Sequence, residues 1–270
     1  MLTSKQHYKE TILLAWPLIL TQVGHIITGM VDTIFLGQIG VAEQAAGIFA
    51  NNIYILLLVF GIGLSYATTP LVTAANEKND LEEKASLFKN SLFLNFGTSI
   101  ILFFILFFSA PLLQYLQQPA DVVALATPFY EVLIFSLLPL SIFFVCKQYC
   151  EGLSNTSAGL IISVLGNLLN IVLNYLLING HMGLPKMGYM GSAWATFIAR
   201  SFMGIAFLYL MYKTPALNAI FTVFKKVKVN MKHLGELAKI GFNSAMQFTF
   251  EVAAFVIAGL MAGSFGKEQI

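Results

Sequence analysis

The sequence predicts an all-α membrane protein, a polytopic helical bundle made of a six-helix lobe and the first helix of a second six-helix lobe. Hydrophobic residues make up 57% of the chain and charged residues only 10%, with a mean hydropathy of +0.78. Soluble domains carry about 25% charged residues, so this composition is typical of a polytopic membrane protein. Two further observations, the apolar segments and the distribution of lysines, support the same fold class.

Seven apolar segments are long enough to cross a bilayer, which takes about 20 residues at roughly 1.5 Å each. They lie at residues 11–37, 45–74, 88–113, 122–150, 157–179, 190–212 and 236–262. The first segment is too long for a signal peptide and lacks a small-residue cleavage site, so we expect it to remain as an uncleaved first span.

The second and fourth segments contain residues that bend helices. Gly61, Gly63 and Pro70 lie in the second segment, and Pro128 and Pro139 lie in the fourth. Proline removes a backbone hydrogen bond and clashes with the carbonyl four residues earlier. Membrane helices tolerate this where their neighbours satisfy the freed backbone groups. We therefore expect kinks in both segments.

The lysines are concentrated in the loops on one side of the predicted bundle. With the N-terminus inside, only Lys186 and Lys267 fall on the outer side. This asymmetry predicts a cytoplasmic N-terminus. The stretch after the sixth segment mixes lysines with Phe and Val, which is typical of an amphipathic helix at the inner leaflet. A specific lipid-binding role for this stretch is the alternative.

A faint internal repeat relates the end of the first segment to the end of the seventh. Gly37 and Gly40 correspond in this register to Gly263 and Gly266. Transporters are often built from repeated bundles. We therefore predict three units: a six-helix lobe over 1–213, an inter-lobe linker over 214–235 and the first helix of a second lobe over 236–270.

Asp32 is a carboxylate inside a spanning segment, which costs about 2.5–3.5 kcal/mol on insertion scales and marks a functional site by default. Counting from the outer ends of the helices places Asn170, Asn174 and Thr196 at a similar depth. The two asparagines are four residues apart and share one helix face. The functional interpretation is a water-accessible polar cavity in which Asp32 binds a proton or cation. The alternative is hydrogen bonding between helices alone.

Glu251 is a second acid, near the middle of the seventh segment, with Gln247 one turn earlier as a further polar cavity residue. A carboxylate at this depth must face protein or water, which suits the exchange of H⁺ or Na⁺. Arg200 is the strongly basic residue inside a span that could pair with an acid. His25 either relays protons or packs as a satisfied histidine, and Lys147 is expected to snorkel from a span end.

The sequence gives no indication of an enzyme. It has no HExxH motif, no phosphate-binding Gly-rich loop, and no Ser-His-Asp set that can be argued from spacing. We therefore expect no cofactor and no nucleic-acid partner. A retinal receptor would need a lysine in the middle of the last span, whereas Lys239 lies at its inner end.

Several stretches resemble the multidrug and toxic compound extrusion (MATE) transporters, in particular the NorM-type branch. The matching stretches are LAWPLIL, VDTIFLGQIG, KQYCEGLSNT, NLLNIVLNYLLING, GLPKMGYMGSAWAT and FEVAAF. The resemblance runs over essentially the whole chain. It implies a multi-pass protein of the bacterial inner membrane that exchanges Na⁺ or H⁺ for organic cations or other amphipathic compounds by alternating access between two six-helix lobes.

The resemblance also implies roles for individual residues. Asp32 takes the place of the coupling carboxylate of the first lobe, and Pro17 that of the proline where the first helix bends. Glu251 matches an acid of the second lobe that is often assigned to cation binding, which implies a Na⁺ site there. The polar cluster around the coupling carboxylate is matched by Asn170, Asn174 and Thr196.

The chain departs from the family pattern in two ways. Some relatives carry an Asp at the position of Asn174, so a network of paired acids is not expected. The sequence also ends after the seventh segment, so it resembles the N-terminal part of a transporter, apparently truncated. We predict that the chain is the N-terminal portion of a cation-coupled (Na⁺ or H⁺) antiporter that exports drugs or organic cations. The alternatives are a lipid-linked precursor flippase of the same superfamily, or a non-transporting membrane scaffold or receptor with dispensable acids.

Overall fold

The computed structural model describes the backbone of residues 4–264 and the side chains of residues 11–215 and 217–258. Gly266, Lys267 and the rest of residues 265–270 in the predicted second-lobe segment lie outside the described residues. The described part is helical throughout, with α1 (Ser4–Ile39), α2 (Val41–Ser65), α3 (Thr68–Glu77), α4 (Leu81–Ser109), η1 (Ala110–Tyr115), α5 (Ala120–Phe135), α6 (Leu137–Gly152), α7 (Thr156–Asn179), η2 (His181–Gly183), α8 (Met190–Lys213), α9 (Pro215–Phe224) and α10 (Met231–Ser264).

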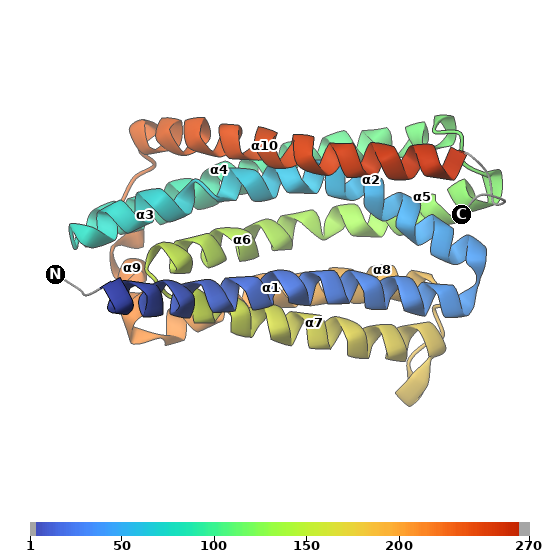
Figure 1. Cartoon of the computed structure of the whole chain (residues 1–270), viewed down its shortest axis with the longest axis horizontal. Coiled ribbons are helices and arrows are strands. Elements are labelled where there is room, and N and C mark those ends of the chain that lie inside the picture. Colours follow the sequence, from blue (N-terminus) through green and yellow to red (C-terminus); the bar gives the residue numbers. More distant parts are fainter. Residues whose placement is uncertain (1–3, 265–270) are drawn as a thin grey trace.

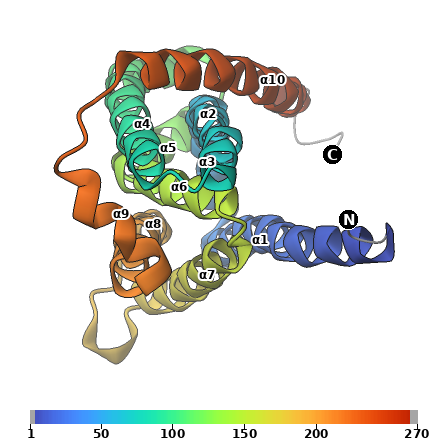
Figure 2. The ribbon, with the colours of Figure 1, turned by 90° about the vertical axis from the view of Figure 1, so that its left-hand side faces the viewer.

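The long helices run side by side along one axis (Figure 1). Six helical stretches of the described chain are long and apolar enough to cross a membrane, and the bent pair α5 and α6 makes a seventh when taken as one span. This confirms the predicted all-α polytopic fold. Seen end-on, α6 lies between a group formed by α1, α7 and α8 and a group formed by α2, α4 and α10 (Figure 2).

Both segments are interrupted just before a proline, and the interruption in the fourth is a sharp bend. The second span breaks between α2 and α3 at Tyr66 and Ala67, and Pro70 stands four residues after Tyr66. The fourth span breaks at Ser136, three residues before Pro139, where α5 and α6 meet at an angle of 43°. The proline ring excludes the carbonyl of the preceding turn, which explains this spacing. Pro128 lies inside α5 without a break.

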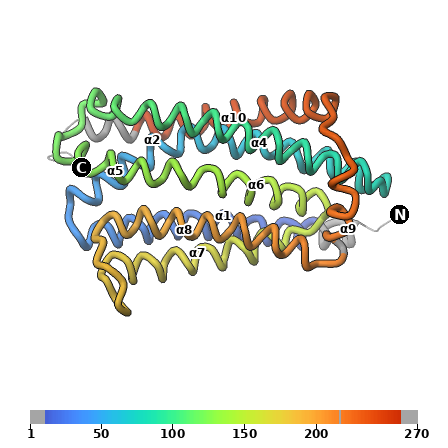
Figure 3. Tube along the Cα trace, turned by 180° about the vertical axis from the view of Figure 1, so that it is seen from behind, coloured from blue at the N-terminus to red at the C-terminus, as the bar shows by residue number. Residues whose placement is uncertain are grey.

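The linker after the sixth predicted segment forms α9 and an irregular stretch that leads to α10. The stretch is fastened to α4: Lys89 Nζ donates to the carbonyl oxygens of Phe224 at 3.1 Å and Val227 at 2.7 Å. The Asn90 side chain accepts from the backbone N–H of Asn230 at 3.0 Å. Figure 3 shows α9 crossing the end of the bundle before the chain turns into α10.

Helix α10 begins five residues before the predicted 236 and packs along α2 and α4. Gly63 of α2 makes this close approach possible, because a Cβ there would lie 2.5 Å from Cα of Ala245. The face of α10 turned away from α2 is exposed, as is much of α1. These two helices form two edges on the same side of the bundle (Figure 2).

Candidate functional site

Asp32 lies in the C-terminal half of α1 and faces α7. Helix α7 begins at the Asn155 cap, whose side chain accepts from the N–H of Ala158 at 3.3 Å, and ends at Gly180, whose φ of 72° is left-handed. These two signals fix the helix over a full span. Asn170 and Asn174 are therefore one turn apart on the buried face that packs against α1.

The structure brings the four predicted cluster residues together. Asn174 Nδ2 donates to Asp32 Oδ1 at 2.7 Å, and also lies 3.0 Å from the carbonyl oxygen and 3.2 Å from the Oδ1 atom of Asn170. Asn170 Nδ2 donates in turn to Thr196 Oγ1 of α8 at 3.3 Å. Asp32 is thus held by a neutral donor, the Asn174 amide, that belongs to another helix.

A cavity of about 200 Å³ opens beside this cluster, between α1, α2, α5 and α8. Asp32 and Thr33 line it from α1, and Asn51 and Asn52 line it from α2. The wall contributed by α8 consists of Ser192, Thr196 and Arg200. These three residues follow a spacing of four, so they share one helix face. The same spacing could have identified Ser192 from the sequence.

Arg200 reaches the cavity without an acidic partner. Its Nη1 atom donates to Ser136 Oγ at 2.8 Å, and its guanidinium lies 5.0 Å from the centre of the Tyr54 ring. Ser136 stands at the break between α5 and α6. Among the described side chains the ion pairs are Lys78–Glu83 and Lys147–Glu151, so Arg200 forms none with Asp32 or Glu251.

Two buried oxygen atoms of this region have no hydrogen-bond partner among the described residues. They are Asn174 Oδ1 and Ser192 Oγ. Buried polar atoms are almost always satisfied, so such atoms indicate a place for water or an ion. The Ser192 hydroxyl and the Asp32 carboxylate line the same cavity, and oxygens of these two kinds suit a proton, a water molecule or a small hard cation.

The remaining predicted site residues lie elsewhere. Gln247 and Glu251 are exposed on α10 and do not line the cavity. Pro17 is buried in α1, which continues through it without interruption. Within the described part of the chain, no three His, Cys, Asp or Glu side chains converge to hold a metal ion. A Na⁺ site at Glu251 stays a prediction.

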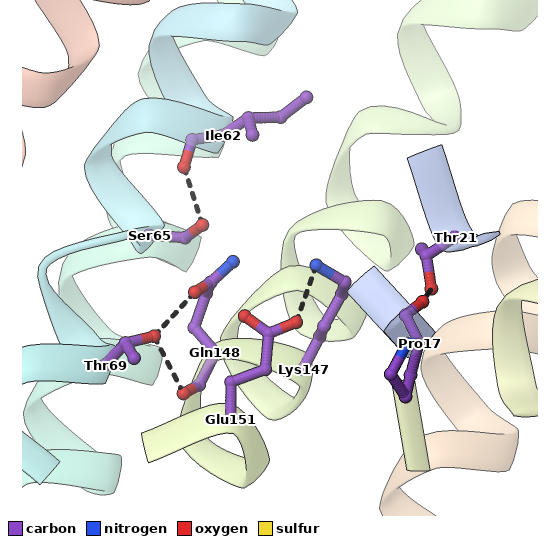
Figure 4. Close-up of polar contacts among 8 residues, drawn as sticks. All are labelled: Pro17, Thr21, Ile62, Ser65, Thr69, Lys147, Gln148 and Glu151. Atoms are coloured by element: carbon purple, nitrogen blue, oxygen red, sulfur yellow. Dashed lines mark hydrogen bonds and ion pairs between the residues drawn. The ribbon is translucent and has the colours of Figure 1, made fainter. Parts of the chain in front are cut away.

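A second polar cluster lies nearer the N-terminal end of α1, at the end of α6 (Figure 4). Lys147 Nζ and Glu151 Oε1 are 2.8 Å apart, an ion pair whose angle falls short of a directed hydrogen bond. Their side chains are only 7% and 9% exposed. The expectation that Lys147 snorkels to the surface is therefore wrong. The four-residue spacing in KQYCE could have identified the pair, although not its burial.

The same end of α6 is joined to α3. Thr69 Oγ1 lies 2.6 Å from Gln148 Oε1 and 3.0 Å from the Gln148 carbonyl oxygen. Thr69 belongs to the first turn of α3, directly after the break in the second span. The contact therefore links the kinked second span to the fourth.

The sequence matches the profile of a protein family described as MatE over residues 17–176. Among relatives, it is 30% identical over 258 residues to a probable multidrug resistance protein NorM of Pseudomonas syringae pv. tomato, which covers 95% of this chain and 56% of the relative. It is 24% identical to a probable multidrug resistance protein NorM of Rhizobium meliloti, with 98% and 56% covered. The chain thus spans about half the length of the curated relatives it matches.

Solved structures show the same fold. The crystal structure of the eukaryotic MATE transporter AtDTX14 superposes with a TM-score of 0.83 at 19% identity, covering 96% of this chain and 56% of that one. A crystal structure of a MATE protein in the bent conformation gives a TM-score of 0.82 at 19% identity, with 92% and 55% covered. The described helices therefore correspond to about half of each of these folds.

Proposed function

Because the chain belongs to the MatE family of membrane transporters, we propose that it supplies one lobe of a cation-coupled antiporter that exports organic cations or other amphipathic compounds. The observation that carries the proposal is the Asp32 cluster. An acid in a spanning helix is held there by a donor of a second helix and opens onto a cavity. Such an acid can exchange its bound cation with water.

The mechanism follows from how Asp32 is held. The ionised carboxylate accepts a strong hydrogen bond from Asn174, and charge-assisted bonds of this kind are worth about 1.5–3 kcal/mol. A proton or Na⁺ bound to the carboxylate competes with this bond. Binding of the cation therefore changes the contact between α1 and α7, and release restores it. This is the coupling of cation occupancy to helix position that an antiporter requires.

Pro17 supports the same mechanism as the point where α1 bends. A proline lacks the N–H that would bond the carbonyl four residues earlier, so one rung of the helix is absent at this level. Thr21 Oγ1 donates to the Pro17 carbonyl oxygen at 2.8 Å, a contact that often accompanies bent membrane helices. Bending here moves the N-terminal half of α1 relative to Asp32.

Glu251 serves in this proposal as a second cation site, with Gln247 beside it. Both are exposed on α10. Exposed polar groups within a span need protein or water beside them. A site at Glu251 is therefore completed by residues that face it across the transport pathway, and Na⁺ is its proposed ligand.

The orientation is part of the proposal. The start of α1, the loop from α3 to α4 and the linker with α9 lie at the same end of the bundle (Figure 1). This end carries most of the lysines, which favours the cytoplasmic side of a bacterial inner membrane.

The test is gradient-driven exchange of a fluorescent organic cation in proteoliposomes that contain the protein. An imposed Na⁺ or H⁺ gradient should drive exchange by the wild type, and Asp32→Asn and Glu251→Gln should abolish its dependence on the gradient. Asp121→Asn, at an exposed acid in the first turn of α5, is the matched control and should transport normally. Unchanged exchange in Asp32→Asn would refute the coupling role.

A further inference from the structure

The contact between α1 and α7 carries a continuous row of polar and small residues. On each helix the members of the row are three or four residues apart, or a multiple of that, so they share one face. The row runs from Asp32 towards the N-terminus of α1 and from Asn174 towards the N-terminus of α7. We call this contact the α1–α7 seam. By helix register its members are Pro17, Thr21, His25 and Asp32 on α1, and Ser163, Asn167, Asn170 and Asn174 on α7. Asn174 bonds Asp32, and Asn167 lies against Gly24 of α1.

His25 lies midway along the seam with an unsatisfied ring nitrogen. Its Nε2 atom is buried and has no hydrogen-bond partner among the described residues. A histidine that only fills space in a packed interface normally has both nitrogens satisfied. The unpartnered Nε2 atom therefore favours the proton-relay alternative over a satisfied packing histidine.

Two polar side chains of α7 lie close to His25 along the seam. At the adjacent Gly24, a Cβ would lie 2.9 Å from Nδ2 of Asn167, so this amide rests directly on α1. One turn earlier on α7, Ser163 Oγ is buried and also lacks a partner within the described part. Unsatisfied polar atoms in adjacent turns are groups that ordered water could bridge.

The seam leads to the Lys147–Glu151 pair. The stem of Lys147 lies on α7 at Gly159, where a Cβ would come within 3.1 Å of its Cγ atom. Lys147 and Arg200 both lie within electrostatic reach of His25. Glu151 is the acid at this end of the seam, and Asp32 is the acid at the other end.

The charged groups around His25 come from three elements. Helix α6 contributes Lys147, which is paired with Glu151, α8 contributes Arg200, and on α1 itself Asp32 follows two turns further along the helix. Helix α7 contributes no acid or base to the seam, and the acid of α2, Glu43, stands at the far end of α1. His25 is therefore the titratable group between the acids at the two ends of the seam.

We propose that His25 is a proton-relay residue that connects Asp32, along a hydrated α1–α7 seam, with the Lys147–Glu151 pair. The inference rests on the proposed role of Asp32 in coupling and adds the route by which its proton exchanges. His25 and Asp32 are two helix turns apart, about 10 Å along the axis, so water completes the connection.

The transfer is balanced at each step. One ring nitrogen of His25 takes the excess proton of a hydronium ion at the Glu151 side, which leaves neutral water, and the other nitrogen releases its proton to water at the Asp32 side. The Asp32 carboxylate then binds that proton. The ring returns to its starting tautomer by rotation, so one proton moves from the Glu151 side to Asp32 and no group is consumed.

The experiment follows the protonation of Asp32 in the protein reconstituted in lipid nanodiscs. A rapid pH jump across neutrality is followed by infrared spectroscopy of protonated carboxyl groups. The Asp32 band is assigned by its loss in Asp32→Asn. His25→Ala and His25→Gln should slow the appearance of this band by about tenfold or more. Added imidazole should restore the rate in His25→Ala.

His181→Ala is the matched control, because His181 is an exposed histidine that stacks on Tyr175 outside the seam. Its rate should equal that of the wild type. A wild-type rate in His25→Ala or His25→Gln overturns the proposal. A slow rate that imidazole does not restore also overturns it, because it indicates a structural role. The absence of any Asp32 band overturns it as well.

The measurement needs no transported compound, so it separates the relay from the coupling role. If Asp32→Asn abolishes exchange in proteoliposomes while His25→Ala keeps the wild-type infrared rate, the proposed function stands and the relay fails. If Asp32→Asn leaves exchange unchanged, the proposed function fails whatever the infrared rate. A slow, imidazole-restored His25→Ala supports the relay.

Discussion

Asp32 and Glu151 are both acids inside membrane spans, but the structure holds them in opposite ways. Glu151 is paired at 2.8 Å with Lys147 of its own helix, and both side chains are buried. Asp32 accepts at 2.7 Å from Asn174 of a different helix and faces a cavity. The charge of Glu151 is compensated within its own helix, whereas that of Asp32 depends on the distance between two helices.

This difference shows how one bundle can contain a fixed acid and an exchangeable one. A charge paired with an opposite charge of the same helix keeps its partner when helices move. A charge held by a neutral amide of another helix loses its partner when they separate, and a proton or cation can then replace it. Glu151 is therefore expected to matter for stability and Asp32 for exchange.

The largest effect is expected from Lys147→Met. This change leaves the Glu151 carboxylate buried without compensation, which typically costs about 3–5 kcal/mol in the free energy of unfolding. Asp32→Asn should cost far less, because the new amide oxygen can still accept from Asn174. Denaturant unfolding in detergent micelles measures both. A double change, Lys147→Met with Glu151→Gln, should recover most of the loss. Equal costs for the two single changes would erase the distinction between the acids.

Asn174→Ala should have the next largest effect, this time on the Asp32 side. It removes the charge-assisted hydrogen bond to Asp32, worth about 1.5–3 kcal/mol. The apparent affinity for the driving cation in the exchange assay should therefore change by roughly tenfold or more. Asn179→Ala is the control on the same helix, since Asn179 is exposed and donates only to the Tyr175 carbonyl oxygen. A matching change in Asn179→Ala would contradict a specific role for Asn174.

A smaller effect is expected at the seam that joins the two acids. Gly24→Ala and Gly29→Ala both replace a glycine inside α1, which favours the helix by about 0.5–1 kcal/mol. A Cβ at Gly24 meets Asn167 at 2.9 Å, whereas one at Gly29 meets nothing within 4 Å. In thermal unfolding, the free energy of unfolding of Gly24→Ala should be lower than that of Gly29→Ala by about 1 kcal/mol. Equal stability would mean that Asn167 moves aside freely and the seam is loosely packed.

The smallest effect on stability is expected from Ser192→Ala. The Ser192 hydroxyl is buried in the cavity wall without a partner among the described residues, so its loss should change the free energy of unfolding by less than about 1 kcal/mol. The apparent cation affinity should nevertheless fall if this oxygen is a ligand. Ser201→Ala, whose hydroxyl bonds the Phe197 carbonyl oxygen of the same helix, should leave the affinity unchanged. Unchanged affinity in both variants would remove Ser192 from the site.

The Asp32 cluster and the kinks could be predicted from the sequence because both follow from regular helix geometry. Counting residues from the helix ends places Asn174 and Thr196 at the depth of Asp32, and the structure joins these residues through hydrogen bonds. Pro70 and Pro139 predict the two breaks, because a proline ring clashes with the carbonyl group four residues earlier in the helix.

The surroundings of charged residues could not be predicted in this way. Lys147 is close enough to a span end in the sequence to reach water, but in the structure it is buried and its stem packs on α7 at Gly159. Arg200 donates a hydrogen bond to the hydroxyl of Ser136, which lies at the break between α5 and α6. Which face of α10 is covered depends on the close contact of Gly63 with Ala245. These arrangements depend on contacts between distant segments, which periodicity does not encode.

The setting of Arg200 also has a consequence for biogenesis. An arginine in the middle of a span costs about 2.5–3.5 kcal/mol during insertion unless it finds partners. Tyr54 and Ser136 stand on spans that precede α8 in the chain, so translation delivers both before Arg200 emerges. The order of synthesis thus matches the order in which these groups are needed. When α8 inserts with its arginine, Tyr54 and Ser136 are already in the membrane to receive the guanidinium.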